Sequence, residues 1–300
     1  MFTITRHTKA NHEFVTLSNK SASEKAVICL DQGGRVVDLI LHNEQLLYPY
    51  SMEAYDAFFA SAILFPFANR IKNGAYRFEN NDYQLPKNEI ANGNAIHGLV
   101  YNKTFEIVKT VASEFKAEVI LEYKTNGADK GFPFSYSLRL KYSLSKKNFI
   151  LEPEITNLDS KTFPFTIGWH PYFIYEEQND NKIVFDKSFR FKYETLHKSL
   201  HMEALNGKVE IDLTEGLDEA FQLNNKQVRW TNKSWILNLL SSEDPSFLQL
   251  FRPKESAIAI EPMTGIADSF HHHIGLKQLA PQETYSLSWQ VYLEKPTRTK

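Results

Sequence analysis

Apolar and polar residues alternate with a period of two along several stretches of the chain. Between residues 134 and 144, every second position holds Phe, Tyr or Leu, with Ser, Arg and Lys between them. The same alternation occurs at residues 119–123, 189–193 and 285–293. Successive side chains of a strand point to opposite faces, so the pattern predicts strands buried on one face and solvated on the other. Such one-sided burial is typical of antiparallel sheets.

Turn-forming dipeptides lie between the apolar stretches. Asn73-Gly74 separates residues 70–71 from residues 76–78, which predicts a β-hairpin at this position. Asn126-Gly127 and Asn206-Gly207 predict further turns. Strands separated by such turns are the arrangement expected of an antiparallel sheet.

Few windows have helical periodicity, and the best candidate, residues 54–64, is ambiguous. The pattern as a whole therefore predicts an all-β fold, a large antiparallel β-sandwich. No linker, low-complexity segment or internal repeat interrupts the sequence. Because a large sandwich can reach this length, we expect residues 1–300 to form a single domain.

The composition narrows the possible partners. Of the residues, 42% are hydrophobic, and 34 basic residues face 36 acidic ones, for a formal net charge of -2. This balance gives no reason to expect a nucleic acid or an anionic membrane as partner. Cys29 lies in the apolar run 26–30, so we expect a buried small hydrophobe rather than a reactive thiol. A single cysteine also excludes an internal disulfide framework.

The first residues contain no apolar stretch of signal-peptide length. No apolar run approaches the roughly 20 residues of a membrane span. We therefore expect a soluble, cytoplasmic protein without a membrane partner.

Candidate chemistry is concentrated at a glutamate and a histidine. Glu261 follows the apolar run 257–260, which places a carboxylate at the end of a predicted strand, where it is either a surface residue or a general base. His170 lies between Trp169 and Pro171 and is followed by Tyr172. It is either a core histidine or a proton donor and acceptor, since imidazole titrates near neutral pH. Trp169 and Tyr172 would then form an aromatic platform for a sugar ring.

Three further segments carry polar candidates. His97 follows a Gly/Asn-rich stretch and precedes Gly98, a setting that suits either an ordinary loop or a pocket. In the segment Asn69-Arg70, the guanidinium of Arg70 either faces solvent or donates a forked pair of hydrogen bonds to vicinal hydroxyls. Asp218 is either a loop acid or an acceptor for sugar hydroxyls. Two imidazoles, a carboxylate and a guanidinium suffice for proton transfer on a polyhydroxylated substrate, without metal or cofactor.

The run His271-His272-His273 raises the question of a metal site. Adjacent residues on an extended strand point to opposite faces, so three in a row cannot easily bind one ion. No Cys or Asp/Glu pattern completes a site, and we expect no functional metal. A nucleophile elbow and phosphate-binding glycine motifs are also absent from the sequence.

Taken in order, six short segments resemble the aldose 1-epimerase (sugar mutarotase) family. The resemblance extends over roughly residues 30 to 292, nearly the whole chain. The segments are Phe65-Pro66-Phe67-Ala68-Asn69-Arg70-Ile71, Tyr83-Gln84-Leu85, Ala95-Ile96-His97-Gly98-Leu99, Gly131-Phe132-Pro133, Gly168-Trp169-His170-Pro171-Tyr172-Phe173 and Glu261-Pro262-Met263-Thr264.

The resemblance implies a galactose mutarotase-like supersandwich with an open cleft across one sheet. It implies Glu261 as general base and His170 as general acid, with His97 and Arg70 near the ring oxygen and adjacent hydroxyls. Asp218 would correspond to a substrate-binding aspartate. Galactose-acting members often carry Thr where this chain has Pro171, and the His-Pro-Tyr-Phe form resembles a bacterial branch with less defined sugar specificity.

The function that follows is the interconversion of α and β anomers of a free hexose, such as galactose or glucose. The expected partner is a small-molecule sugar, and the expected state is a monomer or a weak homodimer. One alternative is a hexose-6-phosphate epimerase, which would need extra cations such as Lys72 or Arg77. Another is a non-catalytic carbohydrate-binding protein on the same fold. Glycoside hydrolysis ranks last, because it normally needs two carboxylates and only Glu261 lies in a matching motif.

Overall fold

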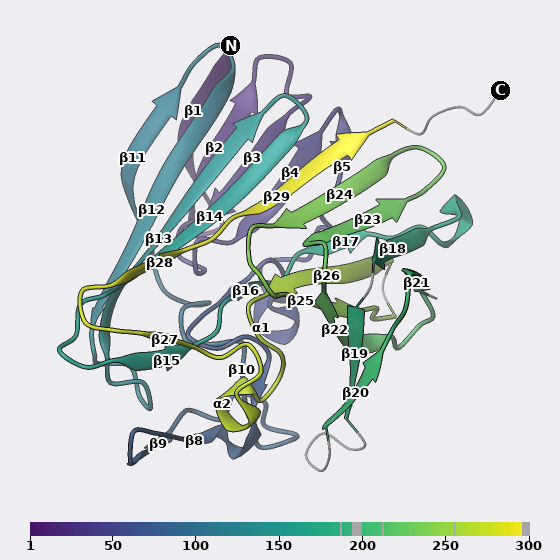
Figure 1. Cartoon of the computed structure of the whole chain (residues 1–300). Helices are drawn as coiled ribbons and strands as arrows, with labels where there is room; N and C mark the ends of the chain where they lie inside the picture. The colour runs from purple at the N-terminus through teal and green to yellow at the C-terminus, as the bar shows by residue number, and fades with distance from the viewer. Residues whose placement is uncertain (187, 194–199, 212, 255, 296–300) are drawn as a thin grey trace.

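The computed structural model describes residues 1–295 apart from residues 187, 194–199, 212 and 255. Antiparallel strands dominate this part of the chain, and two large sheets pack face to face with a smaller N-terminal sheet beside them (Figure 1). The all-β sandwich predicted from the alternating pattern is therefore confirmed. The single-domain organisation stays a prediction.

The N-terminal sheet has the strand order β1-β2-β3-β4-β5. Its strands are β1 (Phe2–Lys9), β2 (His12–Asn19), β3 (Lys25–Cys29), β4 (Val36–Leu41) and β5 (Glu44–Gln45). Cys29 is fully buried, as predicted from its apolar neighbours.

The largest sheet has the order β11-β12-β13-β14-β29-β24-β23-β18-β21, and β28 also pairs with β14. Its strands are β11 (Glu106–Ala112), β12 (Lys116–Asn126), β13 (Ser135–Ser145), β14 (Asn148–Asn157), β18 (Lys182–Asp186), β21 (Lys208–Ile211), β23 (Gln227–Thr231), β24 (Ile236–Ser241), β28 (Thr284–Ser286) and β29 (Trp289–Glu294).

The second large sheet has the order β20-β19-β22-β25-β26-β16-β6, and β17 also pairs with β26. Its strands are β6 (Ile63–Leu64), β16 (Gly168–Trp169), β17 (Tyr172–Ile174), β19 (Ser188–Tyr193), β20 (Leu200–Ala204), β22 (Asp218–Leu223), β25 (Ser246–Phe251) and β26 (Ala257–Met263).

Short elements connect the sheets. Pairs of strands are formed by β7 (Arg70–Ile71) with β10 (Ala95–Ile96), by β8 (Ala75–Phe78) with β9 (Asn81–Gln84), and by β15 (Phe163–Phe165) with β27 (Lys277–Leu279). The helical elements are α1 (Tyr55–Phe58), α2 (Ser269–His272), and the 3-10 turns η1 (Lys72–Gly74) and η2 (Glu177–Asn179). Within the described ranges, no helix is long and apolar enough to cross a membrane.

The predicted strands are confirmed at all the alternating stretches. Residues 119–123 lie in β12, residues 134–144 in or next to β13, and residues 189–193 in β19. Residues 285–293 divide into β28 and β29. The turns predicted at Asn126-Gly127 and Asn206-Gly207 are also confirmed, since Gly127 and Gly207 have φ of 84° and 78° between strands.

The hairpin predicted at Asn73-Gly74 is wrong. These residues form η1, while β7 pairs with β10 and β8 pairs with β9 across a different turn. Long-range hydrogen bonds decide the outcome: the backbone N–H of Asn73 donates to the Asn94 side chain, and Leu85 N–H donates to the Gly74 carbonyl. A local turn signal does not contain this information.

The helix candidate at residues 54–64 shrinks to the single turn α1. Phe59 and Ser61 have φ of 51° and 61°, in the left-handed region that ends a right-handed helix. Residues 63–64 then continue as β6, at the edge of the second large sheet.

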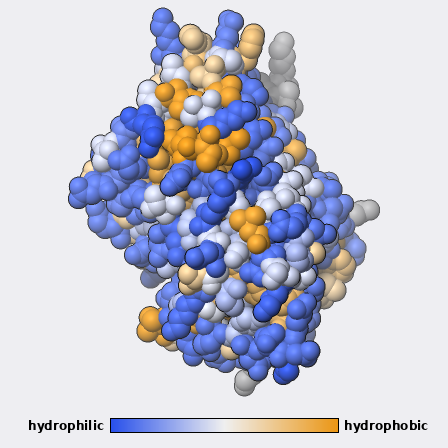
Figure 2. All heavy atoms as spheres, turned by 90° about the vertical axis from the view of Figure 1, so that its left-hand side faces the viewer, coloured by the Kyte–Doolittle hydropathy of each residue, from blue (hydrophilic) through white to orange (hydrophobic). Residues whose placement is uncertain are grey.

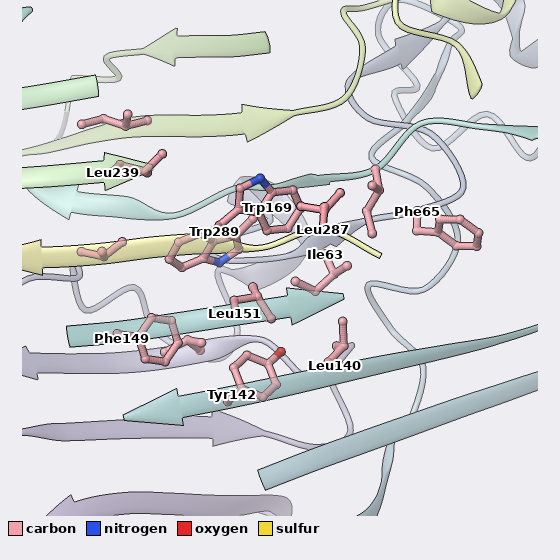
Figure 3. Packing of buried hydrophobic residues seen from close by; sticks show 14 of the residues in the cluster. Ile63, Phe65, Leu140, Tyr142, Phe149, Leu151, Trp169, Leu239, Leu287 and Trp289 are labelled. Atoms are coloured by element: carbon pink, nitrogen blue, oxygen red, sulfur yellow. The ribbon is translucent and has the colours of Figure 1, made fainter. Parts of the chain in front are cut away.

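The core lies between the inner faces of the two large sheets. Figure 3 shows Trp169 from β16 beside Trp289 from β29, with Phe149 and Leu151 of β14 close by. All four side chains are at most 1% exposed. Burial of each such side chain contributes roughly 1.5–3 kcal/mol, so this layer fixes how the two sheets pack.

The outer side of the molecule is more polar. Figure 2 shows the side where the edge strand β11 lies, mostly hydrophilic, with an apolar area in its upper part and smaller apolar spots below it. On β11 itself, Val108 and Val111 are exposed beside charged neighbours such as Glu106 and Lys109. Buried His170, Gln249 and Glu261, by contrast, lie in or next to strands of the second large sheet.

Candidate active site

Glu261 lies in the middle of the second large sheet. It is part of β26, whose residues are all buried, and is itself 2% exposed. The strand continues through Met263, so Glu261 lies within the strand rather than at its end, where the sequence had placed it. Gln249 of β25 faces Glu261 directly in the register, and directly opposed residues project from the same face of a sheet.

His170 occupies the link between β16 and β17, both of which pair with β26. Its backbone is fixed on both sides, because its N–H donates to the Ala62 carbonyl and its carbonyl accepts from Ser61. The imidazole Nε2 lies 3.5 Å from Oε1 of Glu261. Tyr172 stacks on the imidazole with ring centroids 4.9 Å apart and an interplanar angle of 19°.

His97 approaches the same point from β10. Its ring meets that of His170 edge-on, with 4.8 Å between centroids. The residue has a φ of 62°, a conformation that costs a residue other than glycine of order 1–3 kcal/mol. A hydrogen bond from its N–H to the Asn69 carbonyl holds the segment. Gly98 follows with a φ of 78°, and a Cβ there would lie 2.2 Å from the Phe65 carbonyl oxygen.

Arg70 reaches the cleft from β7, the partner of β10. Its Nε donates to Oε1 of Glu89 over 2.8 Å, and its Nη1 donates to the Asn69 side chain over 3.2 Å. Asn94 donates to the other oxygen of Glu89 over 2.7 Å. Glu89 therefore connects the arginine to the segment that carries His97.

Asp218 is the first residue of β22, at the open side of the cleft. Its Oδ1 accepts a hydrogen bond of 2.6 Å from the side-chain amide of Gln249. Because Gln249 also faces Glu261 across the strand pair, the two carboxylates lie along one side of the cleft.

These side chains line a cavity of about 300 Å³, at the lower limit of ordinary small-molecule sites, about 300–1,000 Å³. The predicted residues that it brings together are Asn69, Arg70, His97, His170, Tyr172, Asp218 and Glu261. Phe58, Phe59 and Phe251 complete an aromatic wall, and a second cavity of about 380 Å³ opens beside it.

Trp169 is not among the lining residues of either cavity. Its side chain is fully buried and points into the core between the large sheets (Figure 3). Neighbouring residues of a strand face opposite sides, so a residue next to His170 in β16 faces the core. The predicted aromatic platform is therefore reduced to Tyr172.

Burial sets the proton affinities at the site. It raises the pKa of Glu261 well above its usual range, an effect that Asp218 reinforces and Arg70 opposes. Burial, together with the nearby charge of Arg70, lowers the pKa of His170 to about 3, although a hydrogen bond with its own backbone opposes the shift. The pKa of His97 also falls well below its usual range, through burial and then the charge of His170. The cavity thus favours neutral histidines and a protonated glutamate.

Several buried polar atoms in this cavity have no hydrogen-bond partner within the described residues. They are Nδ1 of His97, Nδ1 of His170 and Oε2 of Glu261. An unsatisfied buried group costs about 1–3 kcal/mol, and such groups in a cleft indicate a polar ligand. Donors and acceptors stand side by side, which matches a ligand whose hydroxyls both donate and accept.

Sequence reasoning missed Glu89 and Gln249. Glu89 lies in a polar loop between β9 and β10, and Gln249 lies in an otherwise apolar strand, where it is 5% exposed. A glutamine within the apolar run 246–251 is the signal that would have found it, because a buried amide requires partners.

A possible metal cluster lies elsewhere. His12 of β2, Cys29 of β3 and Asp31 in the turn between β3 and β4 have ligand atoms within 4.8 Å of one another. Asp31 accepts hydrogen bonds from both neighbours, and burial raises the pKa of the Cys29 thiol to about 12. A protonated thiol in a satisfied hydrogen-bond network accounts for this cluster as a structural feature.

The histidine run forms a helical turn rather than the extended strand assumed from the sequence. His271 hydrogen-bonds Asp268, and His272 uses Nε2 for the Ala267 carbonyl and Nδ1 for the Ile274 N–H. These bonds engage Nδ1 of His271 and both ring nitrogens of His272.

Known proteins resemble this chain in sequence and in fold. The chain matches the profile of the Aldose 1-epimerase family over residues 13–292. The uncharacterized protein YihR of Escherichia coli (strain K12) is 23% identical over 275 residues, 87% of either chain. A galactose mutarotase-like protein from Clostridium acetobutylicum superposes with a TM-score of 0.86 at 21% identity, over 98% of this chain and 99% of that one. Galactose 1-epimerase from Lactobacillus acidophilus NCFM gives 0.79 at 19% identity, over 99% of both chains. At these identities the structural likeness shows the fold alone.

Proposed function

As the chain belongs to the aldose 1-epimerase family, we propose that its cavity interconverts the α and β anomers of a free hexose. The observation that carries the proposal is the contact between His170 and Glu261, two buried groups 3.5 Å apart that can exchange protons with one bound hemiacetal. A protein that only binds sugar needs hydroxyl partners but no matched acid and base. This pair therefore favours catalysis over simple binding.

In the proposed reaction, Glu261 takes the proton from the anomeric hydroxyl while His170 gives one to the ring oxygen. The C1–O5 bond breaks as the C1–O1 bond becomes a carbonyl, which yields the open-chain aldehyde. Rotation about C1–C2 presents the other face of the carbonyl. Return of both protons closes the ring as the opposite anomer. No atom is gained or lost, and no cofactor is needed.

The shifted pKa values of Glu261 and His170 mean that the pair holds one proton between them. Burial disfavours the ionised form of both groups, so the empty site holds neutral His170 and protonated Glu261. This is also the state reached after ring opening in the assigned direction. Ring opening as assigned starts from the other arrangement, so the proton must first pass from Glu261 to His170, over the 3.5 Å between them, when the sugar binds.

The surrounding groups would hold the sugar in place. His97 lies against His170 and offers an unpartnered Nδ1 on the same side of the cavity. Arg70 and Asp218 line the same cavity and would contact hydroxyls away from C1, and Tyr172 offers an aromatic face beside His170. Positioning of this kind converts a weak acid and base into effective catalysts.

The charges in the cavity favour a free sugar over a hexose phosphate. Asp56, Glu89, Asp218 and Glu261 line it, against the cation of Arg70, which already contacts Glu89. A dianionic phosphate would meet net negative charge here. Arg77, a candidate cation for this alternative, is largely exposed beside Asp82 and lines neither cavity.

Anomer interconversion measured from pure α-galactose, α-glucose and other aldoses tests the proposal. Polarimetry or NMR would follow the approach to equilibrium, compared with the spontaneous rate. Glu261→Gln keeps the size of the side chain and should lower kcat/KM by about 10²–10⁴-fold, as should His170→Ala. Near-normal turnover in either variant would remove that residue from the mechanism, and no acceleration of any free sugar would refute the proposal.

A further inference from the structure

Arg35 is a buried cation that lines neither cavity. It is the last residue of the turn between β3 and β4, and its side chain is 2% exposed. Nε donates to the side-chain oxygen of Gln32 over 2.9 Å, and Nη1 donates to the Ala60 carbonyl over 3.2 Å. Nη2 donates to Sδ of Met52 over 3.3 Å, and the guanidinium carbon lies 4.1 Å from the ring centre of Tyr55. Among the residues that the structure describes, its hydrogen-bond partners are thus uncharged, although a buried charge is normally paired with an opposite one.

Three of the four contacted residues belong to a single stretch, residues 52–60, which contains α1 and which we name the α1 segment. The guanidinium contacts this segment at both ends and at the first residue of its helical turn. The turn has 4 residues, far fewer than a helix needs to be stable by itself. The conformation of the α1 segment therefore depends on contacts with the rest of the fold, and Arg35 supplies several of them.

The carbonyl that accepts from Nη1 of Arg35 lies in a bend of the chain. Phe59 and Ser61, on either side of Ala60, have φ of 51° and 61°. Residues other than glycine rarely adopt this conformation, and it persists only where surrounding contacts hold it. The hydrogen bond from Arg35 to Ala60 is one of the contacts that hold this bend.

The α1 segment also faces the catalytic cavity, which residues 56–59 line. The ring of Phe59 lies against that of His97, with 4.9 Å between centroids. Phe58 meets Tyr172 edge-on, with centroids 6.4 Å apart. The aromatic wall of the cavity thus belongs to the same short segment that Arg35 contacts.

The backbone beside Arg35 is anchored on two sheets. Its carbonyl accepts a hydrogen bond of 2.9 Å from the Cys29 N–H in β3. The carbonyl of Gly34 accepts one of 2.5 Å from the Tyr142 hydroxyl in β13. Of the described residues, none from the N-terminal sheet lines the catalytic cavity. Arg35 therefore connects this sheet to the cavity through the α1 segment.

We propose that Arg35 is a positioning residue of the active site, whose guanidinium holds the α1 segment so that Phe58 and Phe59 form the wall against which the sugar binds. The kinetic part of this proposal rests on the proposed function. A guanidinium suits the role because its donors are fixed in a planar fork, so acceptors on several residues must keep their relative positions. Lysine would keep the charge, but its single flexible ammonium cannot replace the fork.

Loss of the fork should weaken sugar binding more than it slows the chemical step. His170 has supports of its own, since its N–H donates to the Ala62 carbonyl and the flanking strands β16 and β17 both pair with β26. The contact between His170 and Glu261 should therefore survive when the α1 segment loosens.

Arg35→Met is the principal variant, because methionine fills part of the same space without a charge or a donor. Leu17→Ala is the matched control: Leu17 is fully buried in β2 of the same sheet, so its truncation lowers stability but removes none of the Arg35 hydrogen bonds. Arg35→Lys replaces Arg35→Met if circular dichroism shows that the methionine variant does not fold.

Two measurements test the proposal at a temperature where every variant is folded. Polarimetry gives KM and kcat for the sugar that the wild type interconverts, and hydrogen–deuterium exchange with mass spectrometry follows the amides of residues 52–62. In Arg35→Met we expect KM to rise about tenfold, kcat to change by about threefold at most, and these amides to exchange about tenfold faster. Arg35→Lys should show the same changes, with KM raised at least about threefold. Leu17→Ala should match the wild type in KM and in the exchange of residues 52–62.

Three results would overturn the proposal. KM in the Arg35 variant stays within about twofold of wild type, Leu17→Ala reproduces the changes, or kcat falls while KM is unchanged. The first two would mean that Arg35 contributes stability alone, and the third that it acts on the chemical step. If the wild type interconverts no sugar, the proposed function fails. Amide exchange then still decides whether Arg35 holds the α1 segment, and unchanged exchange would refute that, so the two failures are distinguishable.

Discussion

Nε2 of His170 lies 3.5 Å from Oε1 of Glu261, and both side chains are almost completely buried. Burial acts on them in opposite directions: it raises the pKa of the carboxyl group and lowers that of the imidazole. Over a broad interval of pH the pair therefore holds a single proton. The two apparent pKa values belong to the pair as a whole.

This relationship predicts a broad pH profile for kcat/KM. Below the lowered pKa of His170, about 3, the pair takes up a second proton and loses its base. Above the raised pKa of Glu261, it loses its only proton and with it the acid. Activity should therefore stay level as pH falls through about 6.5, the ordinary pKa of histidine. Polarimetry from pH 4 to 9 or so, corrected for the spontaneous rate, checks this. An acid limb with its midpoint near 6.5 would show that His170 titrates like an exposed residue.

We expect Glu89 to affect sugar binding by holding Arg70 in position. Burial alone would raise its pKa, but hydrogen bonds from Asn94, Arg70 and Asn92 outweigh that effect and lower it. Glu89→Gln removes the negative charge that holds the guanidinium, so the sugar should bind more weakly. We expect KM to rise about tenfold, a loss of about 1.4 kcal/mol, with kcat changed much less.

The matched control for this variant is Glu106→Gln, since Glu106 is exposed on β11, the edge strand of the other large sheet. Steady-state kinetics of both variants on the same sugar give the comparison. An equal loss in kcat and in kcat/KM for Glu89→Gln, with unchanged KM, would mean that Glu89 acts on the transition state instead.

Local patterns sufficed for the strands, because alternation reports which face of a strand is buried. The stretch 134–144 could be assigned in this way, whereas the segments that carry His97, His170 and Glu261 were found from their residue types. The hairpin at Asn73-Gly74 could not, since its outcome depends on Asn94 and on other residues that are distant in sequence.

The cleft could not be predicted either, for a reason that Gln249 illustrates. Its neighbour Glu261 is twelve residues away, and its other neighbour, Ala220, belongs to a strand that precedes it by almost thirty residues. Register places them in one row, and register depends on the packing of the whole sheet. The prediction that Trp169 contacts the sugar was wrong for the same reason. Its position next to His170 in the sequence does not say on which face of the sheet the Trp169 side chain lies.

Gly98 and Gly93 form a matched pair for testing how the His97 segment is held. Both have positive φ, 78° and 68°, so alanine is strained at either position. At Gly98 a Cβ would lie 2.2 Å from the Phe65 carbonyl oxygen, whereas at Gly93 it would meet nothing within 4 Å. Gly93→Ala should cost about 1 kcal/mol of unfolding free energy, the backbone strain alone.

Gly98→Ala should cost more, because the backbone of Phe65 must also shift. We expect a loss at least about 2 kcal/mol greater than for Gly93→Ala, together with reduced activity as His97 moves. Urea denaturation of both variants gives the difference. Equal losses at the two positions would show that the close approach to Phe65 does not constrain the segment.

A substitution at Trp169 distinguishes a role in the core from a contact with the sugar. It is fully buried between the sheets, and its ring centroid lies 6.1 Å from that of Phe149 on the facing strand β14. Trp169→Phe leaves a void in this layer, so the free energy of unfolding should fall by about 1–3 kcal/mol. KM for the sugar should stay within about twofold of wild type, since the indole lines neither cavity. Tyr172→Leu is the contrasting variant: its ring stacks on His170 in the cavity, so kcat/KM should fall. A raised KM in Trp169→Phe without loss of stability would instead place the indole against the substrate.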